Sequence, residues 1–176
     1  MKFTIWGLFL GLMLAGLVEG CVPSTNVRTD YRPNINFSSY KTFSLAKDKI
    51  VENQFAEERI RRAIGMQLES KGIRQVESDG DLIVHVHARL RVERQIEVWN
   101  TSGWGYRGAM PGPTHIDVRD VPMGTVVVDL VDRAEGVLAW RGVAEGIVNP
   151  KAKPEEAETR VNGAMAELFK GFPPGR

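Results

Sequence analysis

Two histidines with strand-type spacing are the first candidates for chemistry in this chain. His85 and His87 lie two residues apart in an alternating segment, so their imidazoles point to one face and could ligate a metal with a third partner. The remaining histidine is His115. If residues 82–98 and 114–131 form a hairpin, His115 lies opposite about residue 97, roughly 30 Å from the pair. We therefore predict no metal site, and His85 and His87 remain candidate ligands without a third partner.

Polar residues on the neighbouring strands predict an exposed ladder instead. In the same register Asp129 approaches His85 across the hairpin, and Arg141 on the following strand reaches Asp129. Such cross-strand pairs stabilise a sheet face without any catalytic role.

Catalytic motifs are not found in the sequence. No Gly-x-Ser-x-Gly or similar turn supplies a nucleophile, and the carboxylates Asp117, Asp129 and Asp132 are spread over strands and turns. The glycine-rich segment 103–108 fits neither a phosphate loop nor a dinucleotide fingerprint. We predict that the protein is not an enzyme and has no cofactor.

The segment around these glycines holds residue types that are common at interaction hot spots. Trp99, Trp104, Tyr106 and Arg107 lie among or beside flexible glycines, as in loops that bind partners. Three hypotheses remain open: the rings bind a partner, they fold back and cap one end of the sheet, or they sit at a bilayer interface.

Cys21 has a different chemical role, because it ends an export signal. The apolar run over residues 3–18 is shorter than the roughly 20 residues of a membrane-spanning helix. Leu17-Val18-Glu19-Gly20-Cys21 is typical of a lipobox, whose cysteine becomes an acylated N-terminus carrying palmitate or similar chains. An ordinary secretory signal with a coincidental cysteine is the alternative. We predict a signal peptide over 1–20, lipidation of Cys21 and a tether over 21–26.

The predicted anchor places the protein in a bacterial envelope. Val22 follows the cysteine where an aspartate would favour the inner membrane, so we expect the periplasmic face of an outer membrane, if the organism has one. Cys21 is the single cysteine, which leaves no thiol for disulfides. The net charge of +1 comes from interspersed charges of both signs, which argues against nucleic-acid binding.

Apolar periodicity predicts one α+β domain over residues 27–176. Residues 55–71 and 154–169 have the three- and four-residue spacing of amphipathic helices. On the first, Glu57 with Arg61 and Glu58 with Arg62 form i,i+4 pairs on a solvated face.

Strand patterns fill much of the remaining chain. Residues 82–98 alternate, and 114–132 return as β structure interrupted near Pro122 and Gly124. The predicted buried face of the first strand comprises Leu82, Val84, Val86, Ala88, Leu90 and Val92. The segment 137–148 adds Leu138, Trp140, Gly142, Ala144 and Gly146 on one side. Shorter strands are expected at 27–31 and 41–45. In these strands and between them lie the aromatic residues that we expect in the core: Tyr31, Phe37, Tyr40 and Phe43.

These elements, in this order, resemble bacterial envelope lipoproteins that carry the domain of unknown function 4136. The similarity rests on Asp30-Tyr31, Tyr40-Lys41-Thr42-Phe43, Ser78-Asp79-Gly80-Asp81-Leu82, the segment from Gly124 to Asp132, Trp140-Arg141-Gly142 and Phe172-Pro173-Pro174. The resemblance implies an antiparallel β-sheet with a long central hairpin and two helices packed on one face. It implies no established activity and no catalytic residues.

The expected function is therefore that of a non-enzymatic, membrane-anchored envelope lipoprotein. We expect it to bind another envelope component through its sheet face, an edge strand or the aromatic loop. The alternative is a small-molecule or metal-binding periplasmic module, which requires a concave, partly apolar pocket.

Overall fold

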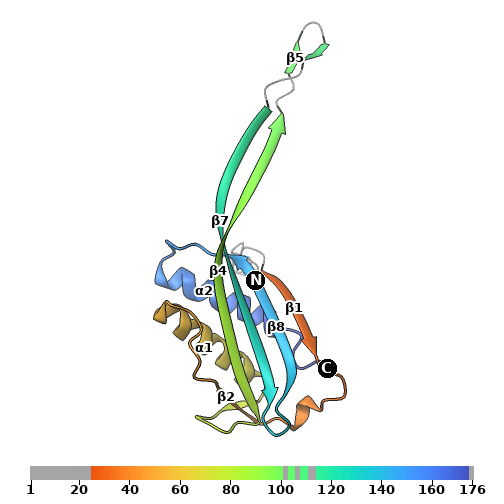
Figure 1. The fold of residues 1–176 in the computed structure, drawn as a ribbon, viewed down its shortest axis with the longest axis vertical. Helices are drawn as coiled ribbons and strands as arrows, with labels where there is room; N and C mark the ends of the chain where they lie inside the picture. Colours follow the sequence, from red (N-terminus) through yellow and green to blue (C-terminus); the bar gives the residue numbers. More distant parts are fainter. Residues whose placement is uncertain (1–24, 101–102, 106–107, 111–113, 175–176) are drawn as a thin grey trace, which may run out of the picture.

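The structure is a computed structural model that describes residues 25–100, 103–105, 108–110 and 114–174. Six strands form one sheet in the order β1-β8-β7-β4-β2-β3, and β5 pairs separately with β6. Figure 1 shows both helices on one face of the sheet, with β4 and β7 continuing beyond it as a narrow projection. The elements in chain order are β1 (Asn26–Tyr31), a 3-10 turn (Phe37–Ser39), β2 (Thr42–Leu45), α1 (Gln54–Ser70), β3 (Arg74–Gln75), β4 (Leu82–Asn100), β5 (Gly103–Gly105), β6 (Gly108–Met110), β7 (Thr114–Asp132), β8 (Val137–Ile147) and α2 (Pro154–Phe169).

The sheet is mixed, which corrects the predicted antiparallel sheet. β2 runs parallel to both β3 and β4, with Phe43 beside Leu82, whereas β4, β7, β8 and β1 pair antiparallel. The chain leaves β2, crosses through α1 and returns to the same end of the sheet before β4 begins. A strand, helix, strand crossover of this kind produces parallel neighbours.

The predicted long central hairpin is confirmed, and it is more regular than expected. β4 and β7 pair without interruption from Leu82 opposite Asp132 to Asn100 opposite Thr114. The expected break near Pro122 is absent, since β7 continues through Pro122, which lies opposite Val92. The carbonyl of Pro122 also accepts a bond of 2.8 Å from the Val148 N–H. His115 lies opposite Trp99, two residues further along β4 than predicted.

One hydrophobic core lies between the helices and the sheet. Ile64 and Leu68 of α1 meet Leu168 and Phe169 of α2 over the buried parts of β4, β7 and β8. Trp140 is 1% exposed, and its indole stacks on Phe169 with ring centres 5.1 Å apart. A Cβ at Gly142 would lie 2.3 Å from that indole and 2.8 Å from Leu168, so glycine gives the ring and α2 the space they occupy.

Leu138 and Tyr31, which we expected in the core, lie at the surface. A bulge between Leu130 and Val131 shifts the register of β8, so that Ala139 and Trp140 are buried and Leu138 is not. Tyr31 is 52% exposed, since it is on the edge strand β1 and covers only the rim of Phe37.

A carboxylate joins the start of β2 to the start of β4. Asp81 accepts bonds of 2.8 and 2.9 Å from the N–H groups of Lys41 and Thr42. Both bonds lower the pKa of Asp81, and the bond from the Lys41 N–H has the larger effect. A Cβ on Gly80 would lie 2.5 Å from the backbone of Phe43 and Ser44, so only glycine allows this close crossing.

Replacing Asp81 by alanine should lower the free energy of unfolding by about 1–3 kcal/mol at pH 7, because two backbone donors lose a charged acceptor. Since the folded-state pKa is depressed, the contribution is present above about pH 4 and lost as the pH falls through that lowered pKa. Urea denaturation at pH 7 and pH 3 measures both effects. The exposed Glu77→Ala is the control, and an equal cost for Asp81→Ala at both pH values would contradict the account.

Neither α1 nor α2, the helices in the described part of the chain, is long and apolar enough to cross a membrane.

Candidate interaction site: the projecting hairpin

The feature that extends furthest from the core is a two-stranded ribbon, which we name the arm. It consists of Val92–Asn100 of β4 and Thr114–Pro122 of β7, beyond the part of β7 that pairs with β8. Apart from the Pro122 carbonyl, which accepts the Val148 N–H, both outer edges of the ribbon are therefore unpaired in the described sheet. Figure 1 shows the arm rising from the end of the sheet, clear of both helices.

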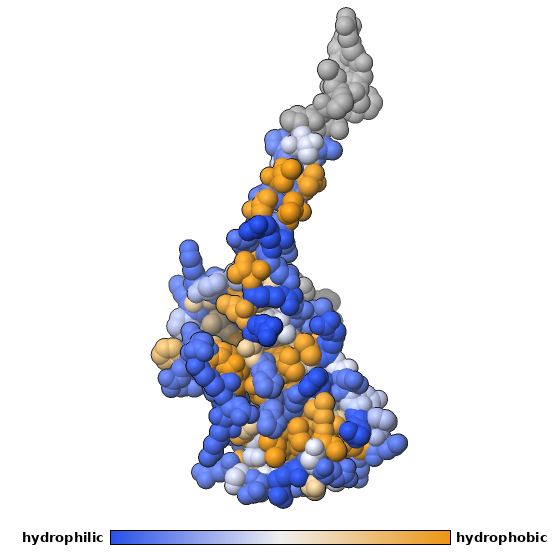
Figure 2. All heavy atoms as spheres, viewed as in Figure 1, coloured by the Kyte–Doolittle hydropathy of each residue, from blue (hydrophilic) through white to orange (hydrophobic). Residues whose placement is uncertain are grey.

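One face of the arm is apolar. Residues opposite each other in an antiparallel pair project to the same side, so Ile96 joins Val118, and Val98 joins Ile116. We name six side chains of this face, each between 52% and 66% exposed, the apolar stripe: Leu90 at the root of the arm, Val92, Ile96, Val98, Ile116 and Val118. Figure 2 shows the stripe as hydrophobic bands along the arm, separated by a hydrophilic band. The ion pair of Arg94 with Asp120, at 3.4 Å, lies between Val92 and Ile96 on this face.

The opposite face of the arm is mostly polar. Arg91, just before the arm, bonds to Glu93 along β4, and Arg119 bonds to Asp117 at 2.7 Å along β7. Each carboxylate raises the pKa of the arginine that it binds, and the hydrogen bond is the largest cause. The ribbon thus has one charged side and one apolar side.

The apolar stripe continues the face of the sheet that forms the core. The same alternation places Leu82, Val84 and Val86 under the helices, where each is at most 3% exposed, while Leu90 and Val92 are more than 59% exposed. The prediction of one buried face through Val92 is therefore wrong beyond Ala88. The helices cover the beginning of β4 only, and the arm carries the same pattern into solvent.

Of the predicted aromatic site, the structure places the side chain of Trp99, at the far end of the arm. Trp99 is 51% exposed and stacks on His115 with ring centres 4.4 Å apart. Trp104 belongs to β5, whose backbone pairs it with Ala109, but its side chain lies outside the description. Tyr106 and Arg107 lie outside the described residues. The choice among partner binding, capping and a bilayer position therefore stays a prediction for these side chains.

The three histidines are not brought together. His85 Nδ1 lies 3.1 Å from Asp48 Oδ2, and His115 is fourteen register positions further along β4, roughly 45 Å away. Among the residues that the structure describes, no group of three histidine, cysteine or carboxylate side chains is placed to hold a metal.

The predicted ladder beside His85 is present in part: Arg141 reaches Asp129, but Asp129 is buried rather than exposed, and His85 bonds to Asp48 instead. Arg141 donates two bonds of 2.6 Å to the carboxylate of Asp129, which pairs with His85 in the strand register. Asp129 raises the pKa of Arg141, and the hydrogen bonding of this bidentate pair is the largest cause. Asp129 is 8% exposed and fully engaged, so the group stabilises the sheet and has no free base.

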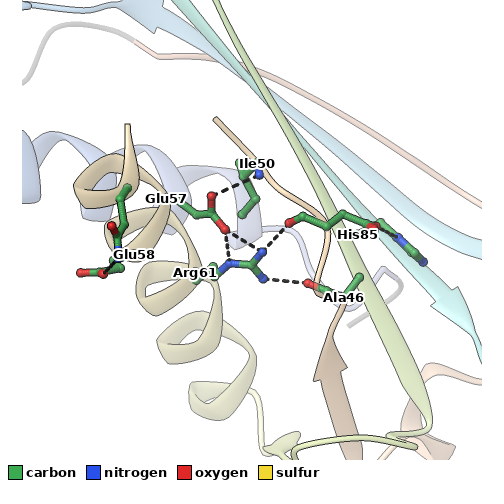
Figure 3. A network of polar contacts seen from close by, with 8 residues as sticks. Ala46, Ile50, Glu57, Glu58, Arg61 and His85 are labelled. Carbon is green, nitrogen blue, oxygen red and sulfur yellow. Dashed lines mark hydrogen bonds and ion pairs between the residues drawn. The ribbon is translucent and has the colours of Figure 1, made fainter. Parts of the chain in front are cut away.

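A second polar network fixes the segment that follows β2. Arg61 bonds to Glu57 on its own helix and to the carbonyls of Ala46 and Asp48, as Figure 3 shows. Arg61 lowers the pKa of Glu57 through their hydrogen bond. The predicted Glu57–Arg61 pair is confirmed, but it ties the 46–50 segment to α1 rather than facing solvent.

The prediction of an ion pair between Glu58 and Arg62 on α1 is wrong. Arg62 lies 2.9 Å from Glu158 of α2 instead of bonding Glu58, and so links the two helices.

Sequence reasoning missed the apolar stripe as a site. Its signal was available in Ile96, Val98, Ile116 and Val118, which alternate with charged residues in both strands. Alternation alone does not show which part of a strand the helices cover.

These features define a mixed-sheet α+β domain with two covering helices and a projecting hairpin. The chain belongs to the family described as "Domain of unknown function (DUF4136)", whose model matches residues 27–174. The resemblance of the sequence to domain of unknown function 4136 is therefore confirmed. The comparison with curated proteins gives no match.

Solved structures share the fold at low identity. A PDZ domain protein from Parabacteroides distasonis superposes with a TM-score of 0.56 and 16% identity over 86% of this chain. The chain spans only 37% of that protein. A PelC dodecamer from Paraburkholderia phytofirmans has a TM-score of 0.52 and 14% identity over 87% of this chain and 100% of its own. These likenesses concern the fold alone.

Proposed function

We propose that this protein is a non-enzymatic lipoprotein of the bacterial envelope that binds a protein partner through the apolar stripe of the arm. The observation that carries the proposal is the set of six large apolar side chains on one face of a ribbon that the rest of the domain leaves uncovered. Isolated exposed apolar residues are ordinary, but a contiguous group with a polar surround is typical of an interaction surface. The lipid anchor at Cys21 rests on the lipobox.

A protein partner fits the arm better than insertion into a bilayer does. In hydrocarbon, the unpaired edges of the ribbon would leave N–H and C=O groups without partners. The charged face, with Glu93 and Asp117, would also have to leave water. A protein surface can cover the stripe on one side while the other side stays hydrated. It can also pair with a free strand edge, as extended peptides do in other sheets.

The ion pair within the stripe adds specificity. Arg94 and Asp120 interrupt the apolar face, so a partner must present polar groups at the same level or leave these charges in water. Such a requirement selects one partner among many apolar surfaces.

A single charge on either face of the arm tests the proposal. Ile96→Asp places a carboxylate in the stripe, where burial against a partner leaves it unpaired, and Gln95→Asp places the same charge on the hydrated face. We expect Ile96→Asp to weaken the complex at least about tenfold, or about 1.4 kcal/mol, and Gln95→Asp to change it little. Both residues are exposed in the arm, so stability should be unaffected.

The full chain is crosslinked in intact cells, and the yield of its protein adduct is compared between the two variants. Equal yields would contradict a partner seated on the stripe. Thermal unfolding of each purified variant separates lost binding from lost folding.

A further inference from the structure

A cavity lies where the arm leaves the domain, between the two helices and the sheet. Its volume is about 520 Å³, within the range of small-molecule sites. Its helix wall includes Ala56, Ile60, Ala157 and Val161, and its sheet wall includes Ala88, Val126 and Ala144. Small side chains on both walls explain why the helices and the sheet do not fill the space.

The cavity is apolar inside and has an excess of positive charge. Arg59 of α1 and Arg160 of α2 line it, and Arg59 makes no ion pair with any described residue. Arg160 is held by Glu156. The one lining carboxylate, Glu145, is already paired with Arg91 and Arg28.

The helices add to this charge at the same place. The lining residues Ala56 and Ala157 are in the first turns of α1 and α2, so the positive N-terminal ends of both helices lie beside the cavity. An occupant with an apolar tail and an anionic head matches the walls and the charge together. A peptide does not, because apolar walls leave its backbone groups unsatisfied.

The chain itself indicates how such an occupant would arrive. Thr25, the first described residue, lines the cavity and follows Cys21 by four residues, a span of at most about 14 Å. If Cys21 is acylated as proposed, the cavity is held near a bilayer. We infer that this cavity binds one acyl chain of an anionic phospholipid, with the headgroup at Arg59. The cavity meets the apolar stripe only at Leu90, and no residue of the arm itself, Val92–Asn100 and Thr114–Pro122, lines it.

The test uses the full chain in micelles of a neutral detergent, so it depends on neither the anchor nor the partner. Two photoreactive probes with the same diazirine-bearing tail are compared at equal mole fraction: phosphatidylglycerol, which is anionic, and phosphatidylcholine, which has no net charge. Mass spectrometry then locates the adducts. We expect phosphatidylglycerol to label peptides of the cavity wall at least about fivefold more than phosphatidylcholine.

Two variants localise the effect. Arg59→Gln should remove most of the headgroup preference, whereas Arg74→Gln, on the exposed strand β3, should keep it. Ala157→Phe should fill the cavity and reduce labelling by both probes, and Ala166→Phe, on the exposed side of the same helix, should not. Equal labelling by the two probes, no labelling of the wall, or labelling unaffected by Ala157→Phe would each overturn the inference.

Discussion

Replacing Cys21 by alanine should abolish acylation of the protein completely. Cys21 is the single cysteine of the chain, so no other thiol can form the thioether of a lipoprotein. Each buried methylene of an acyl chain contributes about 0.8 kcal/mol to membrane binding, so the two or three chains together dominate attachment. Metabolic labelling with a palmitate analogue measures the incorporation directly.

Val22→Ala, next to the modified residue, serves as the matched control and should keep full labelling. Acyl incorporation that persists in Cys21→Ala would refute the lipobox and leave an ordinary secretory signal as the better interpretation. The arm and the cavity would be unaffected by that result, because neither depends on the anchor for its structure.

Replacing Trp140 by alanine should lower the free energy of unfolding by about 3–5 kcal/mol, as removal of a large buried aromatic does. The indole is 1% exposed, stacks on Phe169 and meets Phe172 edge-on with ring centres 5.3 Å apart. Gly142 lies against the ring and has no side chain that could fill the space left by its removal. Since domains of this size are stable by about 5–15 kcal/mol, the variant should be marginal.

Trp99→Ala is the comparison that isolates burial. The same change in the arm removes a ring that is 51% exposed and contacts His115 by stacking, so it should cost about 1 kcal/mol or less. Urea denaturation of the full chain measures both variants. A similar cost for both tryptophans would contradict the assignment of Trp140 to the centre of the core.

Local sequence patterns predicted the positions of the helices and strands well. They predicted poorly which parts of the strands the helices cover. The spacing of apolar residues predicted α2 with its bounds of Pro154 and Phe169, and α1 to within one residue at each end. Alternation predicted β4 and β7 as a hairpin. These signals are local, because periodicity follows directly from the geometry of each element.

Tertiary relations account for the errors. The parallel pairing of β2 depends on the path of the chain through α1, and a four-residue strand carries no mark of its direction. Leu138 is displaced by a bulge that has no clear sequence signal. Val92 has the same pattern as Val84, yet only Val84 lies under a helix.

The candidate site was predicted only in part. Trp99 was proposed from its residue type and lies on the arm. Leu90 and Val92 of the apolar stripe were assigned to the core, because an apolar face is normally buried within its own domain. Arg94 and Asp120, which form the ion pair, are 26 positions apart in the chain. Their contact depends on the register between β4 and β7, which the sequence predicted only to within two residues.

The central claim is that the apolar face of the arm, and not its charged face, contacts another protein. The most direct measurement places a photoreactive amino acid at Ile96 in one strain and at Gln95 in another, since these neighbours project to opposite faces. After irradiation of intact cells, we expect one dominant protein adduct from position 96 and at least about tenfold less from position 95. Equal adducts from both positions, or none from position 96 in a folded protein, would contradict the account.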